Sequence, residues 1–242
     1  MKEADDPEFQ IFDELSKEIF RDFNTVDFYL NKYRTHNESR LSLEQIDDIL
    51  NKASELALNV DQQTDFLHNE KKLALQLESD IQQALHHQNE LTPEILENIR
   101  IRNDELVINV PSMESIISIL KKFKKWEIQY NIVMRQLEIS AANLMAQIRE
   151  HGVFSSRING QYLVVTNEML ERLYEQANAS TLALDSYKTI LLSKIKEARE
   201  LESNIQRCIE SSAEEAELIR LRNEAYQLGV KLKNLPEIEE KV

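Results

Sequence analysis

The sequence predicts an all-α protein, an elongated array of antiparallel helix pairs in which short and long helices alternate, with coiled-coil-like packing. Three observations support this prediction. The 242 residues include only three glycines, where average usage would give about seventeen, and four prolines, so the residues that β turns need are scarce. Apolar residues recur at helical spacing over long stretches. Two segments also repeat at an interval of 50 residues.

Residues 1–40 are expected to form a phenylalanine-rich helical segment outside the repeats. Five of the eight phenylalanines lie in it: Phe9, Phe12, Phe20, Phe23 and Phe28. We expect this cluster to dock on the array or on a partner, which makes Phe9 and Phe12 candidate partner contacts. The acidic start of the chain, MKEADDPEFQ, lacks the apolar run of a signal peptide.

The internal repeat is visible as two pairs of matching segments. LSLEQIDDI (41–49) is similar to LTPEILENI (91–99), and ELALNV (55–60) is similar to ELVINV (105–110). Both pairs are offset by 50 residues, with no gap between them. Two matches in the same register indicate a repeated structural unit of about that length.

Each unit begins with a short helix. Ser42 and Thr92 are the expected N-caps, because their hydroxyls can accept a bond from a backbone N–H of the first turn. Pro93 occupies the expected first helical position, where its missing N–H costs nothing. We expect the two helices to stop before Asn59 and Asn109.

The segment after each short helix carries the residues that we assign to the structural repeat. These are Leu56 and Val60 in the first copy and Leu106 and Val110 in the second. Pro111 disfavours helical geometry at Val110 and is expected to open the next helix.

A single long helix of about 37 residues, roughly 55 Å, is predicted from Met113 onward. Ten of its eleven heptad a and d positions are apolar or aromatic, and Glu127 is the exception. A stripe of this kind packs against a partner helix along its length. The eleven positions are Met113, Ile116, Leu120, Phe123, Glu127, Tyr130, Met134, Leu137, Ala141, Leu144 and Ile148.

Two weaker copies of the unit follow an insertion, which we interpret as a loop or small hairpin around Asn159-Gly160. The third copy has a short helix in 166–184 and a long helix from Ser186 to about Ile209. The fourth is expected to stop at Gly229 and Pro236. The predicted organisation is a helical segment over 1–40, two repeats over 41–150, the insertion over 151–165, and a third and a truncated fourth repeat over 166–242.

The net charge of −14 bears on the choice of partner. An acidic chain repels a phosphate backbone, so nucleic acid is an unfavoured partner, whereas basic histone tails are compatible. No stretch approaches 18 consecutive apolar residues, so we expect no membrane contact. Cys208, the only cysteine, cannot form an intramolecular disulfide, which favours an intracellular compartment.

No catalytic, cofactor-binding or metal-binding residue is assigned. The five histidines include no i, i+4 pair, and a single cysteine cannot build a structural zinc site. Neither GxxxxGK[ST] nor GxGxxG occurs in the sequence. We therefore expect no cofactor and no enzymatic activity in this chain.

The run KKFKKW (121–126) allows two interpretations. Lysines interleaved with aromatic residues can contact a phosphate backbone or an acidic partner. Alternatively, Phe123 belongs to the heptad stripe and the lysine stems cover apolar surface beside it. We favour the structural interpretation and keep an acidic peptide as the candidate partner of the lysines, which are Lys121, Lys122, Lys124 and Lys125.

LTPEILENIRIRNDELVINVPSMESIISILKKFKKWEIQ (91–129) combines a short helix with an acidic start, the run from Leu106 through Val110 to Pro111, and Trp126 in the long helix. This combination resembles the PLU-type helical region of the Jumonji/ARID-class histone lysine demethylases, and the chain is similar to a fungal-type member. The resemblance extends in weaker form over about residues 41–242.

In that family the region is a scaffold between a zinc-bearing segment and a PHD finger, and fungal relatives are similar to subunits of complexes with PHD-finger proteins and histone deacetylases. The resemblance implies a nuclear, non-catalytic scaffold that contacts protein subunits of a chromatin-modifying complex. The Jumonji iron triad, the ARID domain and the cysteine-rich zinc segment have no counterpart in this sequence. The demethylase activity of the family therefore does not carry over to this chain, whether or not its parent protein is active.

An alternative function is a spectrin-like or vesicle-tethering coiled-coil rod subunit. Long heptad helices and an acidic surface suit such a rod equally well. The alternation of short and long helices at 50 residues differs from the three long helices of a spectrin-type repeat, and favours the scaffold.

Overall fold

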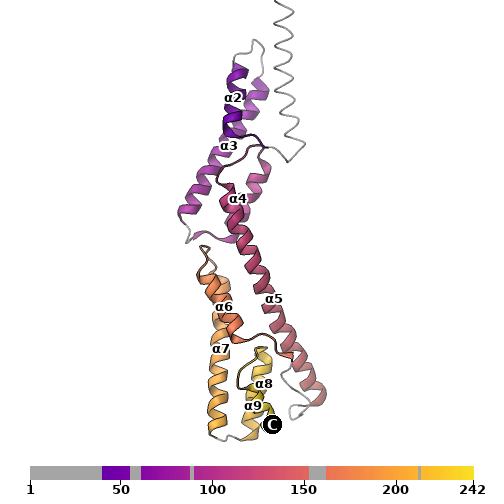
Figure 1. The fold of residues 1–242 in the computed structure, drawn as a ribbon. Coiled ribbons are helices and arrows are strands. Elements are labelled where there is room, and N and C mark those ends of the chain that lie inside the picture. The colour runs from indigo at the N-terminus through magenta and orange to yellow at the C-terminus, as the bar shows by residue number, and fades with distance from the viewer. Residues whose placement is uncertain (1–39, 55–60, 88–89, 153–161, 212–213) are drawn as a thin grey trace, which may run out of the picture. The chain divides into compact units, whose positions relative to one another are not determined.

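The computed structural model describes residues 40–54, 61–87, 90–152, 162–211 and 214–242. In these residues the regular secondary structure is helical apart from two isolated β-bridges, which confirms the predicted all-α class (Figure 1). The arrangement into antiparallel repeat pairs stays a prediction. The helices are α2 (Leu43–Ser54), α3 (Asp61–His86), α4 (Pro93–Glu105), α5 (Met113–His151), α6 (Asn167–Asn178), α7 (Asp185–Glu210), α8 (Glu215–Leu228) and α9 (Leu235–Lys241).

The long helix predicted from Met113 is confirmed. It is α5, one continuous helix of 39 residues. Pro93 is the first residue of α4, as expected. Pro111 lies in a turn directly before α5, and the helix itself begins two residues later.

The fourth copy differs from the prediction at its end. Gly229 terminates α8, as predicted, and it adopts the left-handed conformation with φ of 74°. The predicted stop at Pro236 is wrong, because Pro236 lies in the first turn of a further helix, α9. A proline fits there since the first turn of a helix has no intrahelical acceptor for its missing N–H.

Some predicted features lie outside the described residues. They are the phenylalanine cluster with Phe9 and Phe12, the repeat positions Leu56 and Val60, and the turn at Asn159-Gly160.

The chain divides into two compact units. The first comprises the chain up to His87 together with Glu94–Ile119, and the second comprises Gln88–Pro93 and Leu120–Val242. The first unit therefore contains α2, α3, all of α4 except Pro93, and the beginning of α5, and the second contains most of α5 and all of α6 to α9.

In the first unit, a reciprocal pair of hydrogen bonds fixes the start of α2. Ser42 Oγ accepts from Gln45 N at 3.2 Å, and Ser42 N donates to Gln45 Oε1 at 2.9 Å. This is a capping box, and it confirms the predicted N-cap at Ser42. One turn further on, the side chain of Ile46 is fully buried.

Two carboxylates of α3 hold the segment between α4 and α5. Glu70 Oε2 accepts from Val107 N, and Glu78 Oε2 accepts from Ser112 N, both at 3.1 Å. Burial raises the pKa of Glu78, but hydrogen bonds from Ser112 and Gln82 outweigh it, so the pKa lies below its ordinary value. These bonds satisfy backbone N–H groups that have no helical partner.

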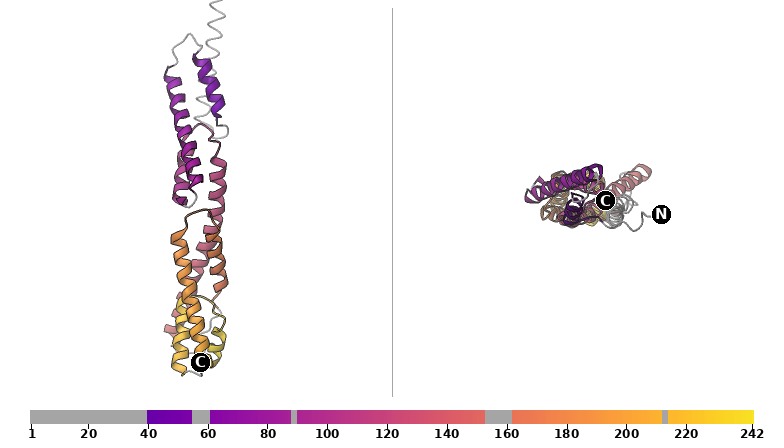
Figure 2. Two further views of the ribbon diagram at one scale, coloured as in Figure 1. Left: turned by 90° about the vertical axis from the view of Figure 1, so that its left-hand side faces the viewer. Right: turned by 90° about the horizontal axis from the view of Figure 1, so that it is seen from above.

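The core of the second unit lies between α5 and the helices α6, α7, α8 and α9. In this unit α6 and α7 lie side by side (Figure 2). Arg222 of α8 is among the buried residues, at 1% exposure, and its guanidinium lies 5.7 Å from the ring centre of Tyr226. The Tyr226 hydroxyl donates to Glu239 Oε1 at 2.7 Å. Burial, followed by the contact with Glu239, raises the pKa of Tyr226.

Within the described residues, a similar backbone connection occurs three times, twice as an isolated β-bridge and once as a single hydrogen bond. Leu41, just before α2, pairs with Ile108, which follows α4. The carbonyl of Leu91, before α4, accepts from Ala183 N, which follows α6. The carbonyl of Val165, before α6, accepts from Lys231 N, which follows α8. In each case the residue that leads into one short helix bonds to the segment that follows the next short helix, which supports a repeated unit.

Candidate interaction surface

The inner face of α5 carries the predicted heptad stripe. None of its eleven positions is exposed: eight are buried and three are half-buried. Val133 and Ser140, which the heptad pattern omits, are buried as well. Ser140 is accommodated because its hydroxyl donates to the carbonyl of Tyr162 at 2.9 Å.

Four aromatic side chains pack together where α5 meets α7. Trp126 stacks on Tyr130 with ring centres 5.5 Å apart, and Tyr187 of α7 meets both rings edge-on. Phe123 completes the cluster at 6.1 Å from Trp126 and from Tyr187. The Trp126 indole N–H donates to the carbonyl of Leu173 in α6 at 3.3 Å. This cluster ties α5 to two other helices of its unit.

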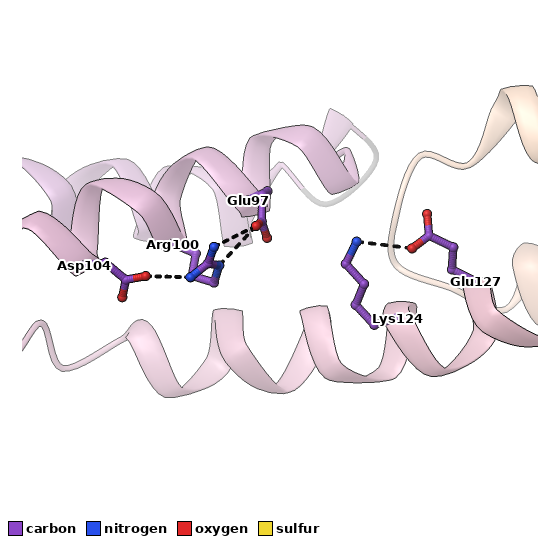
Figure 3. A network of polar contacts seen from close by, with 5 residues as sticks. All are labelled: Glu97, Arg100, Asp104, Lys124 and Glu127. Carbon is purple, nitrogen blue, oxygen red and sulfur yellow. Dashed lines mark hydrogen bonds and ion pairs between the residues drawn. The ribbon is translucent and has the colours of Figure 1, made fainter.

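Glu127, the one charged residue of the stripe, has a structural explanation. Its Oε1 accepts from the Tyr187 hydroxyl at 3.0 Å, and its Oε2 accepts from Lys124 Nζ at 3.2 Å (Figure 3). A carboxylate can occupy this half-buried position because both of its oxygens have partners.

The lysines of the KKFKKW run lie around the buried Phe123, as the structural interpretation predicts. All four are exposed, and Phe123 is buried. Lys124 Nζ lies 5.7 Å from the centre of the Phe123 ring, besides its contact with Glu127. Among the residues that the structure describes, Lys121, Lys122 and Lys125 have no ion-pair partner. The position of these three leaves their ammonium groups available to a partner.

A group of exposed isoleucines on α5 was not predicted from the sequence. Ile128, Ile132 and Ile139 are all exposed and follow the lysine run. The sequence signal for them is a second row at heptad spacing on the same helix, which lies outside the eleven-position stripe.

Two residues assigned to the structural repeat, Leu106 and Val110, lie in the described part of the chain and pack in its interior. Leu106 and Val110 are buried, with Ile108 between them fully buried, so the segment between α4 and α5 packs with alternate residues inward. Pro111 is exposed in the turn before α5. Ion pairs such as those of Arg100 with Glu97 and Asp104 lie on the exposed side of α4 and offer little stabilisation (Figure 3).

Within the described ranges, no group of three or more His, Cys, Asp or Glu side chains is placed to hold a metal ion. Cys208 is half-buried and packs against the core of the second unit. None of the described helices is both long and apolar enough to span a bilayer.

Comparisons with known proteins found no match for this chain among family models, curated proteins or solved structures.

Proposed function

We propose that the chain is a non-catalytic scaffold region of a Jumonji-family, histone demethylase-like chromatin regulator. It holds protein subunits of a chromatin-modifying complex, one that contains a histone deacetylase, and it acts in the nucleus. The proposal rests on the resemblance of residues 91–129 to the PLU-type region.

One observation supports the proposal most strongly: the residues that carry the resemblance hold the helical framework together. Leu106 and Val110 are buried, and Trp126 both stacks on Tyr130 and donates to the carbonyl of Leu173. A motif made of framework residues suits a protein whose task is to position other proteins.

The alternative, a spectrin-like or vesicle-tethering rod subunit, is favoured by a different observation. The 39 residues of α5 form one uninterrupted helix, about 58 Å long at its ordinary rise, as rod proteins have. The two proposals differ in compartment and in partners.

Affinity purification tests both. The tagged chain is incubated with nuclear extract, and the eluate is assayed for deacetylation of an acetylated histone peptide. We expect deacetylase activity with the wild-type chain and none with the control Leu144→Asp, which places a charge at a fully buried position of α5. An eluate without deacetylase activity would contradict the scaffold. Recovery of cytoskeletal or vesicle proteins in a parallel purification from whole-cell extract, together with cytoplasmic localisation of the chain, would favour the rod.

A further inference from the structure

The face of α5 opposite the core carries exposed apolar residues. Ile128, Ile132 and Ile139 are 59%, 56% and 42% exposed. At about 100° per residue, they lie within about 40° of one another around the helix, and the buried Leu137 and Leu144 point to the other side. Single exposed apolar residues are common, but three on one face make a stripe that water contacts unfavourably.

The stripe is part of a second heptad row. Lys121, Lys125, Ile128, Ile132, Arg135 and Ile139 are separated by four, three, four, three and four residues, and all six are exposed. We call these six residues the outer seam. Alternating steps of four and three are the pattern of a helix that packs against a second helix along its length. From Lys121 to Ile139 the seam is about 27 Å long, so a partner helix of about 18 residues would cover it.

The charge of the outer seam is opposite to that of the chain. Residues 121–146 contain five cationic residues and two carboxylates, a net charge of +3, whereas the whole chain has −14. One of the two carboxylates, Glu127, is already engaged by Tyr187 and Lys124. In the part of the chain that is described, Lys121, Lys125 and Arg135 have no ion-pair partner.

These charges select one kind of occupant. In a two-fold symmetric dimer built on this face, a second copy of this chain would bring another cationic seam against the first, and like charges repel. A nucleic acid or an anionic lipid surface would also meet the rest of a chain with −14, which repels it at longer range. A single acidic helix contacts the seam alone, places apolar residues against the isoleucines, and places carboxylates beside the cations.

We propose that the outer seam of α5 is the docking site for an acidic amphipathic helix of a partner protein. This inference rests on the proposed scaffold function, because it names the surface that one of the assembled subunits uses. Ile128, Ile132 and Ile139 supply the apolar contact. Lys121, Lys125 and Arg135 set the choice of an acidic partner.

The probe is a fluorescently labelled synthetic peptide of three heptads with Leu at a and d and Glu at e and g. Its binding to the full chain is measured by fluorescence anisotropy at low and high salt. We expect saturable binding that weakens as salt rises, because exposed ion pairs are screened. A peptide with Lys in place of Glu should not bind.

Two variants of the seam separate the apolar contact from the charge. Ile128→Asp/Ile132→Asp should weaken binding by about tenfold or more, because two apolar side chains lose their contact. Lys121→Glu/Lys125→Glu/Arg135→Glu should lose the Glu peptide and gain the Lys peptide. The matched controls are Ile190→Asp and Arg172→Glu/Lys196→Glu, at exposed positions of α6 and α7 in the same unit, and both should bind like wild type.

The outcomes are distinguishable. Absence of binding by the Glu peptide, or a loss equal in seam and control variants, would overturn the inference. So would a dimer of the chain that the seam variants dissociate, or binding to vesicles with about a third anionic lipid that the seam variants abolish. Circular dichroism and the fluorescence of Trp126, the single tryptophan, verify that each variant is folded. If the peptide tests fail while the wild-type chain still recovers deacetylase activity from nuclear extract, the scaffold stands and only the docking site is wrong.

Discussion

Gly229 ends α8 at the point where that helix meets the backbone of α5. Its φ is 74°, a conformation that residues with a Cβ adopt only with strain. A Cβ at this position would lie 2.5 Å from the carbonyl oxygen of Leu137, which is backbone and cannot turn aside. Glycine is therefore required at this position for two reasons, the positive φ and the short distance to the Leu137 carbonyl oxygen.

Gly152, at the end of α5, provides a matched comparison, because its φ is 83° and a Cβ there would meet nothing within 4 Å. We expect Gly152→Ala to lower the free energy of unfolding by about 1–2 kcal/mol through backbone strain alone. Gly229→Ala should cost a further ~1–3 kcal/mol, because α8 must move away from α5. Urea unfolding followed by Trp126 fluorescence measures both. Equal losses in the two variants would show that the backbone of α5 yields at no cost.

Single residues also show where sequence reasoning fails. Gly229 was predicted as a helix end from its type, but its approach to Leu137 joins parts of the chain that are distant in sequence. Arg222 occupies a position one turn from Leu218, on the buried face of α8, yet a cation is ordinarily assigned to the surface. Its guanidinium lies 5.7 Å from the ring of Tyr226, one turn further along the same helix, a pairing that helical spacing permits. The burial of this face depends on packing against other helices, which the sequence of α8 alone does not show.

Among the elements, α5 was the easiest to predict from the sequence, but only its buried face was predicted and its outer seam was not. A heptad stripe of eleven positions identifies the buried face without any knowledge of the partner helices. The outer seam has the same spacing but mixes lysine, arginine and isoleucine. It is recognised as a candidate interface only because Ile128 and Ile132 are exposed in the structure. A periodic pattern predicts which residues share a face, and the structure decides whether that face is covered.

An exposed ion pair, whose strength depends on pH, joins the first turn of α6 to the segment that follows α8. Glu168 Oε1 lies 2.9 Å from Lys233 Nζ, in the segment that follows α8. The hydrogen bond from Lys233, with further bonds from the Glu168 backbone and Thr166, lowers the pKa of Glu168 from 4.5 to about 2. A carboxylate whose pKa is lower in the folded state stabilises fully above pH 4.5, and this stabilisation is lost as pH falls toward 2.

We therefore expect Glu168→Gln to destabilise the protein at pH 7, and the difference from wild type to shrink as pH falls from 4.5 to 2. Because the pair is exposed to solvent, the effect should be small and weaker at high salt. Urea unfolding of both proteins at pH 7 and pH 3 measures it. In Lys233→Gln the same substitution of Glu168 should have a smaller effect, and an undiminished effect would assign the stabilisation to the helix N-terminus instead.

At the scale of the whole molecule, fold class followed from composition. The chain has few glycines and prolines and long stretches with helical apolar periodicity, which together predict helices. The described residues do form helices. The sequence did not reveal that the chain forms two units that share α5, because a continuous heptad stripe runs through the boundary at Leu120 without a break. The boundary between the two cores depends on which other helices pack against each part of α5, and these helices lie elsewhere in the chain.

The net charge of −14 leads to a prediction for the whole chain. On a heparin column at pH 7.5 and about 0.1 M salt, we expect the protein to flow through, because repulsion by the acidic surface exceeds the attraction of one cationic face. An anion exchanger under the same conditions should retain it, which serves as the control. Retention on heparin would mean that the lysines around Phe123 outweigh the overall charge, and would reopen nucleic acid as a partner.

Three backbone connections each join the residue before one short helix to the segment that follows the next short helix. These connections all run in the same direction along the chain. In the described residues, Leu41, Leu91 and Val165 each bond to a residue later in the chain. Deleting one copy would therefore remove its own hydrogen bonds, and it would also leave the backbone carbonyl of the preceding copy without its N–H donor.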